Sequence, residues 1–239
     1  MPLSPATRDQ LKKVSVATLC SVLFKRGLRN QVIQGARPLN PGLPVMVGEA
    51  YTVRYMPARE DRNPMSVFQN REHPQRKAVE ECPPGHVLVF DSRKDHRAAS
   101  AGGILVSRLM VRGVAGVVTD GGFRDSHEIA ALAIPAYHVQ PSAPTNLTLH
   151  EAIAINDPIG CGDAPVFPGD VIVGDQEAVI VIPAGIADAV ADEATAMTVY
   201  EDFVIDMVQN HGRPILGLYP ATDTQSLIDF EAWRKQHNR

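Results

Sequence analysis

The spacing of apolar residues predicts helices at both ends of the chain. Residues 7–27 carry apolar side chains three and four positions apart, and Gly27 is a suitable stop, so one helix is expected there. Residues 184–209 place apolar side chains on one side and acids on the other, which predicts a long helix. A last helix is expected over 224–236, where Leu227, Phe230 and Trp233 form an apolar stripe that packs against this chain or a neighbouring subunit.

The middle of the chain alternates short apolar runs with glycine and proline turns, which is the pattern of strands. A helix is expected over 103–112 and should end at Gly113. Short strands separated by turns are expected over 158–183. The other strands are expected over residues 45–55, 86–91, 114–119 and 134–139. Strands flanked by helices at both ends predict a single α/β domain over residues 1–239.

Two segments stand outside this pattern. Residues 58–76 are polar and charged and contain two prolines, so they are interpreted as a surface insertion with a helical turn around Met65–Gln69. A lid over a functional site is the alternative interpretation of this segment. Residues 211–239 are interpreted as a C-terminal extension.

Composition and charge narrow the function classes. The chain is 44% hydrophobic and 21% charged with a net charge of −4 and no basic block, which argues against a nucleic-acid partner. No apolar run approaches the roughly 20 residues that span a bilayer, and no signal-peptide pattern is present. We therefore expect a cytoplasmic protein without a membrane partner. The three cysteines are Cys20, Cys82 and Cys161. They lie far apart in the sequence, which predicts reduced thiols and no zinc site.

The first candidate for chemistry is the start of the helix predicted at 103–112. Gly102 and Gly103 have no side chains to block approach, and the amides of Ile104 and Leu105 lie in the first turn. Such amides have no partner within the helix, and the helix dipole adds positive potential, so they can bind a carboxylate. A simple tight turn would explain the same residues.

The second candidate is the pair Arg124 and Asp125, which follows the strand predicted at 114–119. The planar guanidinium suits a carboxylate or an enolate oxygen, although a surface ion pair with Asp125 or Glu128 is the alternative. Asp125 could bind Mg²⁺ together with several waters, with Asp120 and Glu128 near in sequence to hold outer-shell water. Capping of a short helix at 126–132 is the alternative for Asp125.

Three further patterns are set aside. His127 is interpreted as a solvated loop residue. The stretch Thr119–Gly122 lacks the lysine that a phosphate-binding loop requires. Cys161 stands between two glycines without a supporting histidine motif, so a tight turn is expected rather than a nucleophile.

The order of several motifs resembles the RraA-like family, which contains the regulator of ribonuclease activity A and the class II 4-hydroxy-4-methyl-2-oxoglutarate aldolases. The resemblance runs over most of the chain and includes the Arg124-Asp125 signature. The matching blocks are residues 14–18, 25–27, 47–53, 112–118, 166–170, 173–175 and 181–183.

The resemblance implies a fold, an assembly and a site. The fold would be a layered ββα sandwich similar to the swivelling phosphohistidine domain, with helical N- and C-terminal extensions, and the protein would be a homotrimer or hexamer. Mg²⁺ or Mn²⁺ would bind at Asp125, and an acid of a neighbouring subunit, Glu193 or Glu201, would assist through water. A small-molecule carboxylate substrate would be held by Gly102, Gly103, Ile104, Leu105 and Arg124.

One departure from the family affects the expected reaction. The aldolases carry an aspartate 21 positions before the motif arginine, where this chain has Gly103. We still expect a metal-dependent carbon–carbon lyase that cleaves a 4-hydroxy-2-oxo acid, decarboxylates oxaloacetate, or both, through a metal-stabilised enolate. The alternatives are a sugar-acid dehydratase that uses the same site and a non-catalytic regulator that binds a protein partner such as a ribonuclease.

Overall fold

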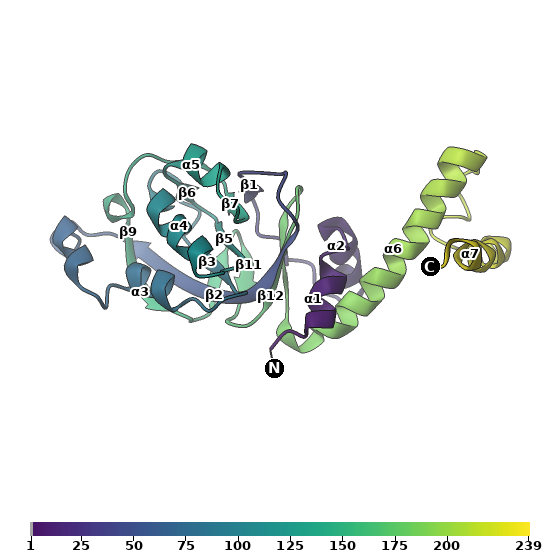
Figure 1. The fold of residues 1–239 in the computed structure, drawn as a ribbon, viewed down its shortest axis with the longest axis horizontal. Helices are drawn as coiled ribbons and strands as arrows, with labels where there is room; N and C mark the ends of the chain where they lie inside the picture. The colour runs from purple at the N-terminus through teal and green to yellow at the C-terminus, as the bar shows by residue number, and fades with distance from the viewer. Residues whose placement is uncertain (1) are drawn as a thin grey trace.

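The computed structural model describes residues 2–239 and is built around an eight-stranded mixed sheet (Figure 1). Its strand order is β1-β7-β5-β3-β2-β12-β13, and β9 also pairs with β2. The neighbours from β7 to β2 are parallel, and β1, β9, β12 and β13 add antiparallel pairs. The strands are β1 (Arg37–Pro38), β2 (Met46–Pro57), β3 (Val87–Asp91), β5 (Gly116–Thr119), β7 (Ala136–His138), β9 (His150–Ile155), β12 (Val171–Gly174) and β13 (Val179–Ile182).

A single segment, residues 31–38, joins the two ends of this strand order. The Ile33 amide donates to the Val179 carbonyl at 2.9 Å, and the Val181 amide donates to the Gln31 carbonyl at 2.8 Å. A few residues later the same segment becomes β1 and pairs with β7. The sheet therefore curves into a nearly closed barrel. The α/β class is confirmed, whereas the similarity to the swivelling phosphohistidine domain stays a prediction.

The barrel separates three apolar cores. One core lies between the sheet and helices α3 (Pro74–Glu81), α4 (Gly103–Val111) and α5 (Ser126–Ala130). Another lies between β12, β13 and the terminal helices. The third fills the barrel and includes Met46, Val89, Val118 and Ile172. Because β2 contributes to all three cores, it is buried on both faces over most of its length.

A small parallel sheet beside the barrel positions the candidate site. It has the order β4-β6-β8, formed by Ala99–Ala101, Gly122–Phe123 and Gln140–Pro141. Helix α4 (Gly103–Val111) begins two residues after β4, and helix α5 (Ser126–Ala130) begins three residues after β6. The Arg124 amide donates to the Ala101 carbonyl at 3.1 Å, which brings the two helix starts side by side. A separate hairpin pairs β10 (Ile159–Cys161) with β11 (Ala164–Val166).

The N-terminal region contains two helices, so the expectation of one helix over residues 7–27 is wrong. Helix α1 spans Pro5–Leu11 and helix α2 spans Val16–Lys25. The break occurs because the Ser15 hydroxyl accepts a hydrogen bond from the Thr18 amide at 3.0 Å and starts a new helix there. Both helices pack against α6 (Ala187–His211).

The segment 58–76 is less solvated than its composition suggests. The expected turn is present as the short helix η1 (Met65–Gln69), but the end of the segment starts helix α3 (Pro74–Glu81), which was not predicted. His73 and Gln75 are buried. Strand β9 was also not predicted, and it pairs with the second half of β2. Two further short helices are η2 (Asn146–Thr148) and η3 (Ala184–Ile186).

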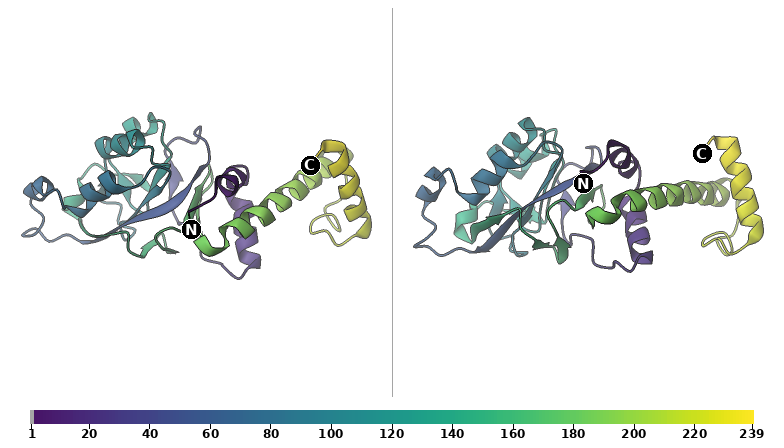
Figure 2. Two further views of the ribbon diagram at one scale, coloured as in Figure 1. Left: turned by 60° about the horizontal axis from the view of Figure 1, so that its bottom comes forward. Right: turned by 90° about the horizontal axis from the view of Figure 1, so that it is seen from below.

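The C-terminal half of α6 projects away from the barrel and carries α7 (Thr224–His237) across its end (Figures 1 and 2). Phe230 and Trp233 pack against a small core centred on Phe203 of α6. Leu227 of the same expected stripe is exposed, as is Ile228. The stripe is therefore only partly covered within this chain. No helix among residues 2–239 is long and apolar enough to cross a membrane.

Candidate active site

The sequence-predicted site residues converge on one pocket of about 190 Å³. Gly102, Ile104, Leu105, Arg124 and Asp125 line it, and Gly103 contacts it through Asp125. The remaining wall comes from α3, β4 and the start of η2 with the residue before it. The residues that complete the pocket are Gln75, Arg76, Ala99, Ala101, Thr145 and Asn146.

Asp125 caps the start of α4 rather than the helix it precedes. It stands at the N-cap position of α5 in the left-handed conformation, with φ 56° and ψ 36°, and its side chain makes no capping bond there. Instead its Oδ2 accepts a hydrogen bond from the Gly103 amide at 3.1 Å. The alternative interpretation of Asp125, a cap on residues 126–132, is therefore wrong. The Gly103 amide is also occupied and cannot hold a substrate while this bond persists.

The first turn of α4 leaves one free amide instead of the two expected. The Leu105 amide donates to the Gly102 carbonyl at 3.0 Å, because the first turn is tightened in the manner of a 3₁₀ helix. The Ile104 amide has no hydrogen-bond partner within residues 2–239. A carboxylate at this helix start would therefore bind the Ile104 amide and lie in the positive potential of the helix dipole.

Arg124 is half-exposed and keeps its hydrogen-bonding capacity for a ligand. Its Nε lies 3.8 Å from Oδ1 of Asp125, and it forms no ion pair with Glu128 in the part of the chain that the structure describes. Its carbon stem packs over Gly102. A Cβ at Gly102 would lie 2.7 Å from Cγ of Arg124 and 2.9 Å from Oδ2 of Asp125. A glycine at position 102 is therefore required for this pair to reach the pocket.

Asp120 does not belong to the pocket, contrary to the expectation that it holds outer-shell water. It is buried, and its carboxylate accepts hydrogen bonds from the amides of Ser92, Lys94 and Gly162 at 2.7, 3.0 and 3.1 Å. Burial raises the pKa of this carboxyl above its ordinary value. Asp120 therefore holds three loops together, while Glu128 is exposed on α5 and does not line the pocket.

The other titratable candidates also lie elsewhere. Cys161 is fully buried, and desolvation raises the pKa of its thiol well above the ordinary value, which agrees with a structural turn. His127 is exposed and does not line the pocket. Glu193 pairs with Arg26 at 3.1 Å, and Glu201 accepts a hydrogen bond from the Thr18 hydroxyl at 2.9 Å. Their expected role in a neighbouring subunit's site stays a prediction.

Helix α3 contributes a wall that sequence reasoning missed. Gln75 is fully buried, and its amide nitrogen donates to the Ser100 carbonyl at 2.6 Å and to the Tyr55 hydroxyl at 3.1 Å. Arg76 follows it and lines the pocket. Pro74 at the first helical position was the available signal, because proline favours a helix start. The polar composition of residues 58–76 obscured that signal.

The metal-binding capacity of the pocket rests on Asp125 alone. No group of three or more His, Cys, Asp or Glu residues that could hold a metal ion occurs within residues 2–239. Oδ1 of Asp125 accepts no hydrogen bond there, so it is available as a ligand. A single carboxylate suits Mg²⁺, which keeps several waters when bound, so the donor set fits a hydrated divalent cation.

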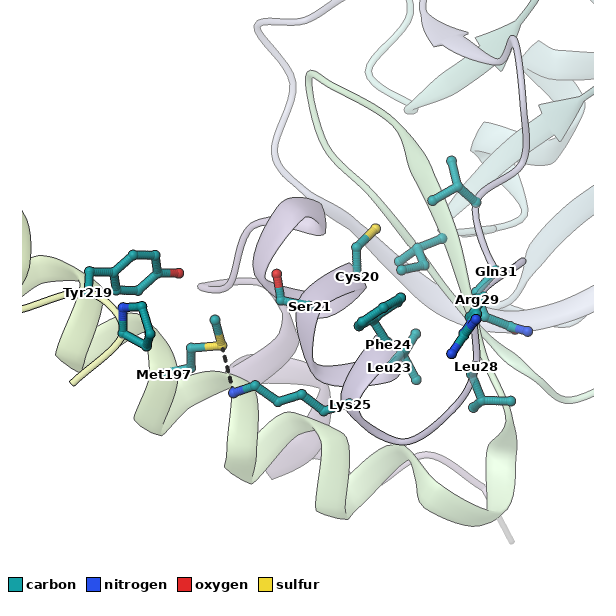
Figure 3. A pocket seen from close by; sticks show the side chains of 13 residues that line it. Cys20, Ser21, Leu23, Phe24, Lys25, Leu28, Arg29, Gln31, Met197 and Tyr219 are labelled. Atoms are coloured by element: carbon teal, nitrogen blue, oxygen red, sulfur yellow. Dashed lines mark hydrogen bonds between the residues drawn. The ribbon is translucent and has the colours of Figure 1, made fainter. Parts of the chain in front are cut away.

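A second, larger cavity of about 650 Å³ lies between α2 and α6 (Figure 3). Its wall is mostly apolar and includes Phe24, Met197 and Tyr219, and the Lys25 ammonium contacts the Met197 sulfur at 3.9 Å. None of its lining residues is a histidine or a carboxylate. The smaller pocket therefore has the better chemistry for a reaction, despite its smaller volume.

The protein is therefore an α/β protein with a nearly closed barrel. In its small pocket, the Arg124-Asp125 pair faces a helix that begins at a glycine. The chain belongs to the RraA-like family, because the family model described as Aldolase/RraA matches residues 16–181. A putative 4-hydroxy-4-methyl-2-oxoglutarate aldolase of Halalkalibacterium halodurans is 38% identical over 122 residues, which cover 49% of this chain and 56% of that protein. The match thus spans little more than half of that relative.

Solved structures agree with this assignment. The Streptomyces coelicolor protein RraAS2, described as an unusual member of the RNase ES inhibitor RraA protein family, has a TM-score of 0.75 and 27% identity. The match covers 85% of this chain and 97% of RraAS2. A Pseudomonas syringae protein of uncharacterised function has a TM-score of 0.76 at 22% identity, over 92% of this chain and 99% of that chain, which supports the fold alone.

Proposed function

We propose that this chain is a lyase of small 2-oxo acids. Its reactions would be retro-aldol cleavage of a 4-hydroxy-2-oxo acid and decarboxylation of oxaloacetate, both of which release pyruvate or a close analogue. The observation that carries this proposal is the convergence of Arg124, Asp125 and the free Ile104 amide on one pocket. The putative aldolase names of two relatives, 38% and 29% identical over part of the chain, support the same reaction class.

The pocket offers separate groups for the C1 carboxylate and the C2 oxygen of the substrate. The substrate carboxylate would accept a hydrogen bond from the Ile104 amide at the positive end of α4. The guanidinium of Arg124 would donate to the oxygen on C2. This arrangement would fix the C3–C4 bond in the pocket between the helix start and the Arg–Asp pair.

In the retro-aldol reaction, electron pairs shift toward the C2 oxygen, and a proton moves from the C4 hydroxyl to C3. When the C3–C4 bond breaks, its electrons form the C2–C3 double bond and place negative charge on the C2 oxygen. Arg124 would stabilise this enolate more than the neutral ketone, which lowers the barrier. The C4 hydroxyl proton would leave to a water held by Asp125, the only pocket-lining residue of the described chain with a carboxylate. The same water would then return a proton to C3, which completes pyruvate, while C4 leaves as the carbonyl carbon of the second product. In oxaloacetate decarboxylation the C4 carboxylate leaves as CO₂ and water supplies the C3 proton.

Asp125 would also hold Mg²⁺ or Mn²⁺ together with waters. Such an ion, when bound, supplies a Lewis acid for the charge that develops on the substrate oxygen. The chain's own contribution is to keep Oδ1 of Asp125 free by tying Oδ2 to the Gly103 amide. An aspartate in place of Gly103 would bring a second carboxylate beside Asp125, and its absence here leaves the pocket with one.

Pyruvate release from 4-hydroxy-4-methyl-2-oxoglutarate and from oxaloacetate, measured with coupled lactate dehydrogenase and added Mg²⁺, tests the proposal. We expect activity in the wild type, a loss of at least about 100-fold in kcat/KM for Arg124→Gln, and partial retention for Arg124→Lys. A stable wild-type protein with no turnover of either substrate would reject the lyase. Formation of a 2-oxo-3-deoxy acid from a sugar acid would instead indicate the dehydratase.

A non-catalytic regulator is the second candidate, because RraAS2 matches most of this chain and carries an RNase ES inhibitor family description. Such a regulator would bind a ribonuclease through its surface, and the loss of Arg124 would not affect it. Inhibition of a purified ribonuclease by both wild type and Arg124→Gln, without pyruvate formation, would favour this candidate. We expect a homotrimer or hexamer in either case, which light scattering can measure.

A further inference from the structure

We propose that Arg76 binds the distal carboxylate of the substrate and so makes the pocket selective for 2-oxo acids that carry a second carboxylate. This inference rests on the proposed function, because it assigns the opposite end of the same pocket. It concerns α3, which lies outside the Arg124-Asp125 signature and comes from the end of the segment 58–76.

The first observation is that Arg76 has no carboxylate partner in the described chain. Arg76 is half-buried and forms no ion pair among residues 2–239. Its guanidinium carbon lies 4.3 Å from the centre of the Phe68 ring. Stacking on a ring face leaves the N–H groups at the guanidinium edge available, and that edge fits a carboxylate with two parallel hydrogen bonds.

The second observation is the way Arg76 is held. Its neighbour Gln75 donates to the Ser100 carbonyl at 2.6 Å, on the strand that leads directly into Gly102. The same amide nitrogen donates to the hydroxyl of Tyr55 on β2 at 3.1 Å. These two bonds fix the first turn of α3 to the strand that precedes α4. Arg76 is therefore positioned relative to the anion-binding helix start and is not a free surface arginine.

The third observation is the charge of the pocket wall. Arg76 and Arg124 are the cations that line it, and Asp125 is the acid. A substrate with one carboxylate at the α4 start would leave the guanidinium of Arg76 without a counter-charge. Asn146 lines the same wall; it is 4% exposed, and its buried side-chain nitrogen has no partner in the described chain. A dianion supplies the counter-charge that Arg76 lacks.

Two ligands that differ only at the distal end test the inference. 2-Oxoglutarate and 2-oxopentanoate have the same chain length, but the first ends in a carboxylate and the second in a methyl group. Titration calorimetry of the 239-residue chain should show about 10- to 100-fold tighter binding of 2-oxoglutarate. Arg76→Gln should remove this preference and leave the affinity for 2-oxopentanoate unchanged, and Arg76→Lys should restore part of it.

Arg71→Gln is the matched control, because it removes the same charge from an exposed residue of the same segment that does not line the pocket. It should keep the wild-type preference. Equal wild-type affinity for both ligands, no binding of either, an equal loss of both in Arg76→Gln, or the same loss of preference in Arg71→Gln would overturn the assignment. Pyruvate release reports separately on the lyase. Selective binding without turnover would reject the reaction but retain Arg76 as a distal carboxylate site.

Discussion

The carboxylate of Asp125 accepts a hydrogen bond from the Gly103 amide at 3.1 Å, so the signature acid of one loop caps the helix that begins in another. This bond links the conformation of the Arg124-Asp125 loop to the start of α4. The left-handed backbone of Asp125 points its side chain across the pocket rather than along α5. Helix capping and pocket electrostatics therefore depend on the same side chain.

Substitutions of Asp125 can separate these two roles. Asp125→Ala removes the cap, which should cost about 1 kcal/mol of unfolding free energy, and removes the pocket acid. Asp125→Asn retains a hydrogen-bond acceptor and should keep most of that stability, while pyruvate release falls as in the alanine variant. Urea denaturation and the coupled assay measure the two effects. Equal activity in Asp125→Asn and wild type would contradict the proposed role of the charge.

Gly102→Ala should lower activity with a small effect on stability. The added Cβ would lie 2.7 Å from Cγ of Arg124 and 2.9 Å from Oδ2 of Asp125, so both side chains would move out of the pocket. We expect kcat/KM to fall by at least about tenfold, since a misplacement on the order of 1 Å can cost that much or more. Gly160→Ala is the control, because nothing lies within 4 Å of a Cβ there. A fall of the same size in Gly160→Ala would remove the support for this explanation.

Gln75→Ala should affect substrate binding more than chemistry. It removes two buried hydrogen bonds and leaves the Ser100 carbonyl and Tyr55 hydroxyl without this donor, which should cost about 1–3 kcal/mol of stability. Because Arg76 would then be less well positioned, KM for a dicarboxylate should rise while kcat changes little. Steady-state kinetics with 4-hydroxy-4-methyl-2-oxoglutarate checks this. A fall in kcat at constant KM would indicate that Gln75 acts on the reacting end instead.

The stability of the protein should fall in mild acid because of His138. This residue is buried beside Phe123, and desolvation lowers its pKa from 6.5 to about 4. A histidine that is neutral in the folded state and protonated in the unfolded state favours unfolding. The contribution of neutral His138 to the free energy of unfolding is therefore intact above pH 6.5. This contribution declines as the pH falls from 6.5 to about 4 and is fully lost below that range.

His138→Phe removes the titrating group from this position and should flatten that part of the pH dependence. Thermal melts of wild type and variant at pH 7.5 and pH 5 give the comparison. His127→Gln is a suitable control because His127 is exposed. An acid-induced fall in Tm that is the same in all three proteins would show that His138 is not responsible.

Sequence patterns located the helix start at Gly103 and the pair Arg124-Asp125, because glycine turns and apolar runs are local signals. They could not show which amide is free. The bond from Gly103 to Asp125 and the tightened turn at Leu105 depend on the pairing of β4 with β6, residues more than 20 positions apart. The resemblance to known aldolases supplied the role of these residues rather than their contacts.

The α3 side of the pocket was missed for a related reason. Residues 58–76 have a polar composition, and the burial of Gln75 depends on partners on β2 and β4. Similarly, β9 was missed because its pairing with β2 is a long-range contact between positions about 100 residues apart. The N-terminal break at Ser15 had a local signal, since serine is a preferred cap, but the apolar spacing continued through it.

The segment 31–38 has a consequence for how copies of this chain can meet. By hydrogen-bonding to β13 at one end and to β7 at the other, it occupies backbone donors and acceptors that a strand from another molecule would otherwise recruit. Strand addition is thereby blocked along both of these borders. Self-association of the barrel would have to proceed there through side chains, which makes its specificity depend on surface composition rather than on generic peptide groups.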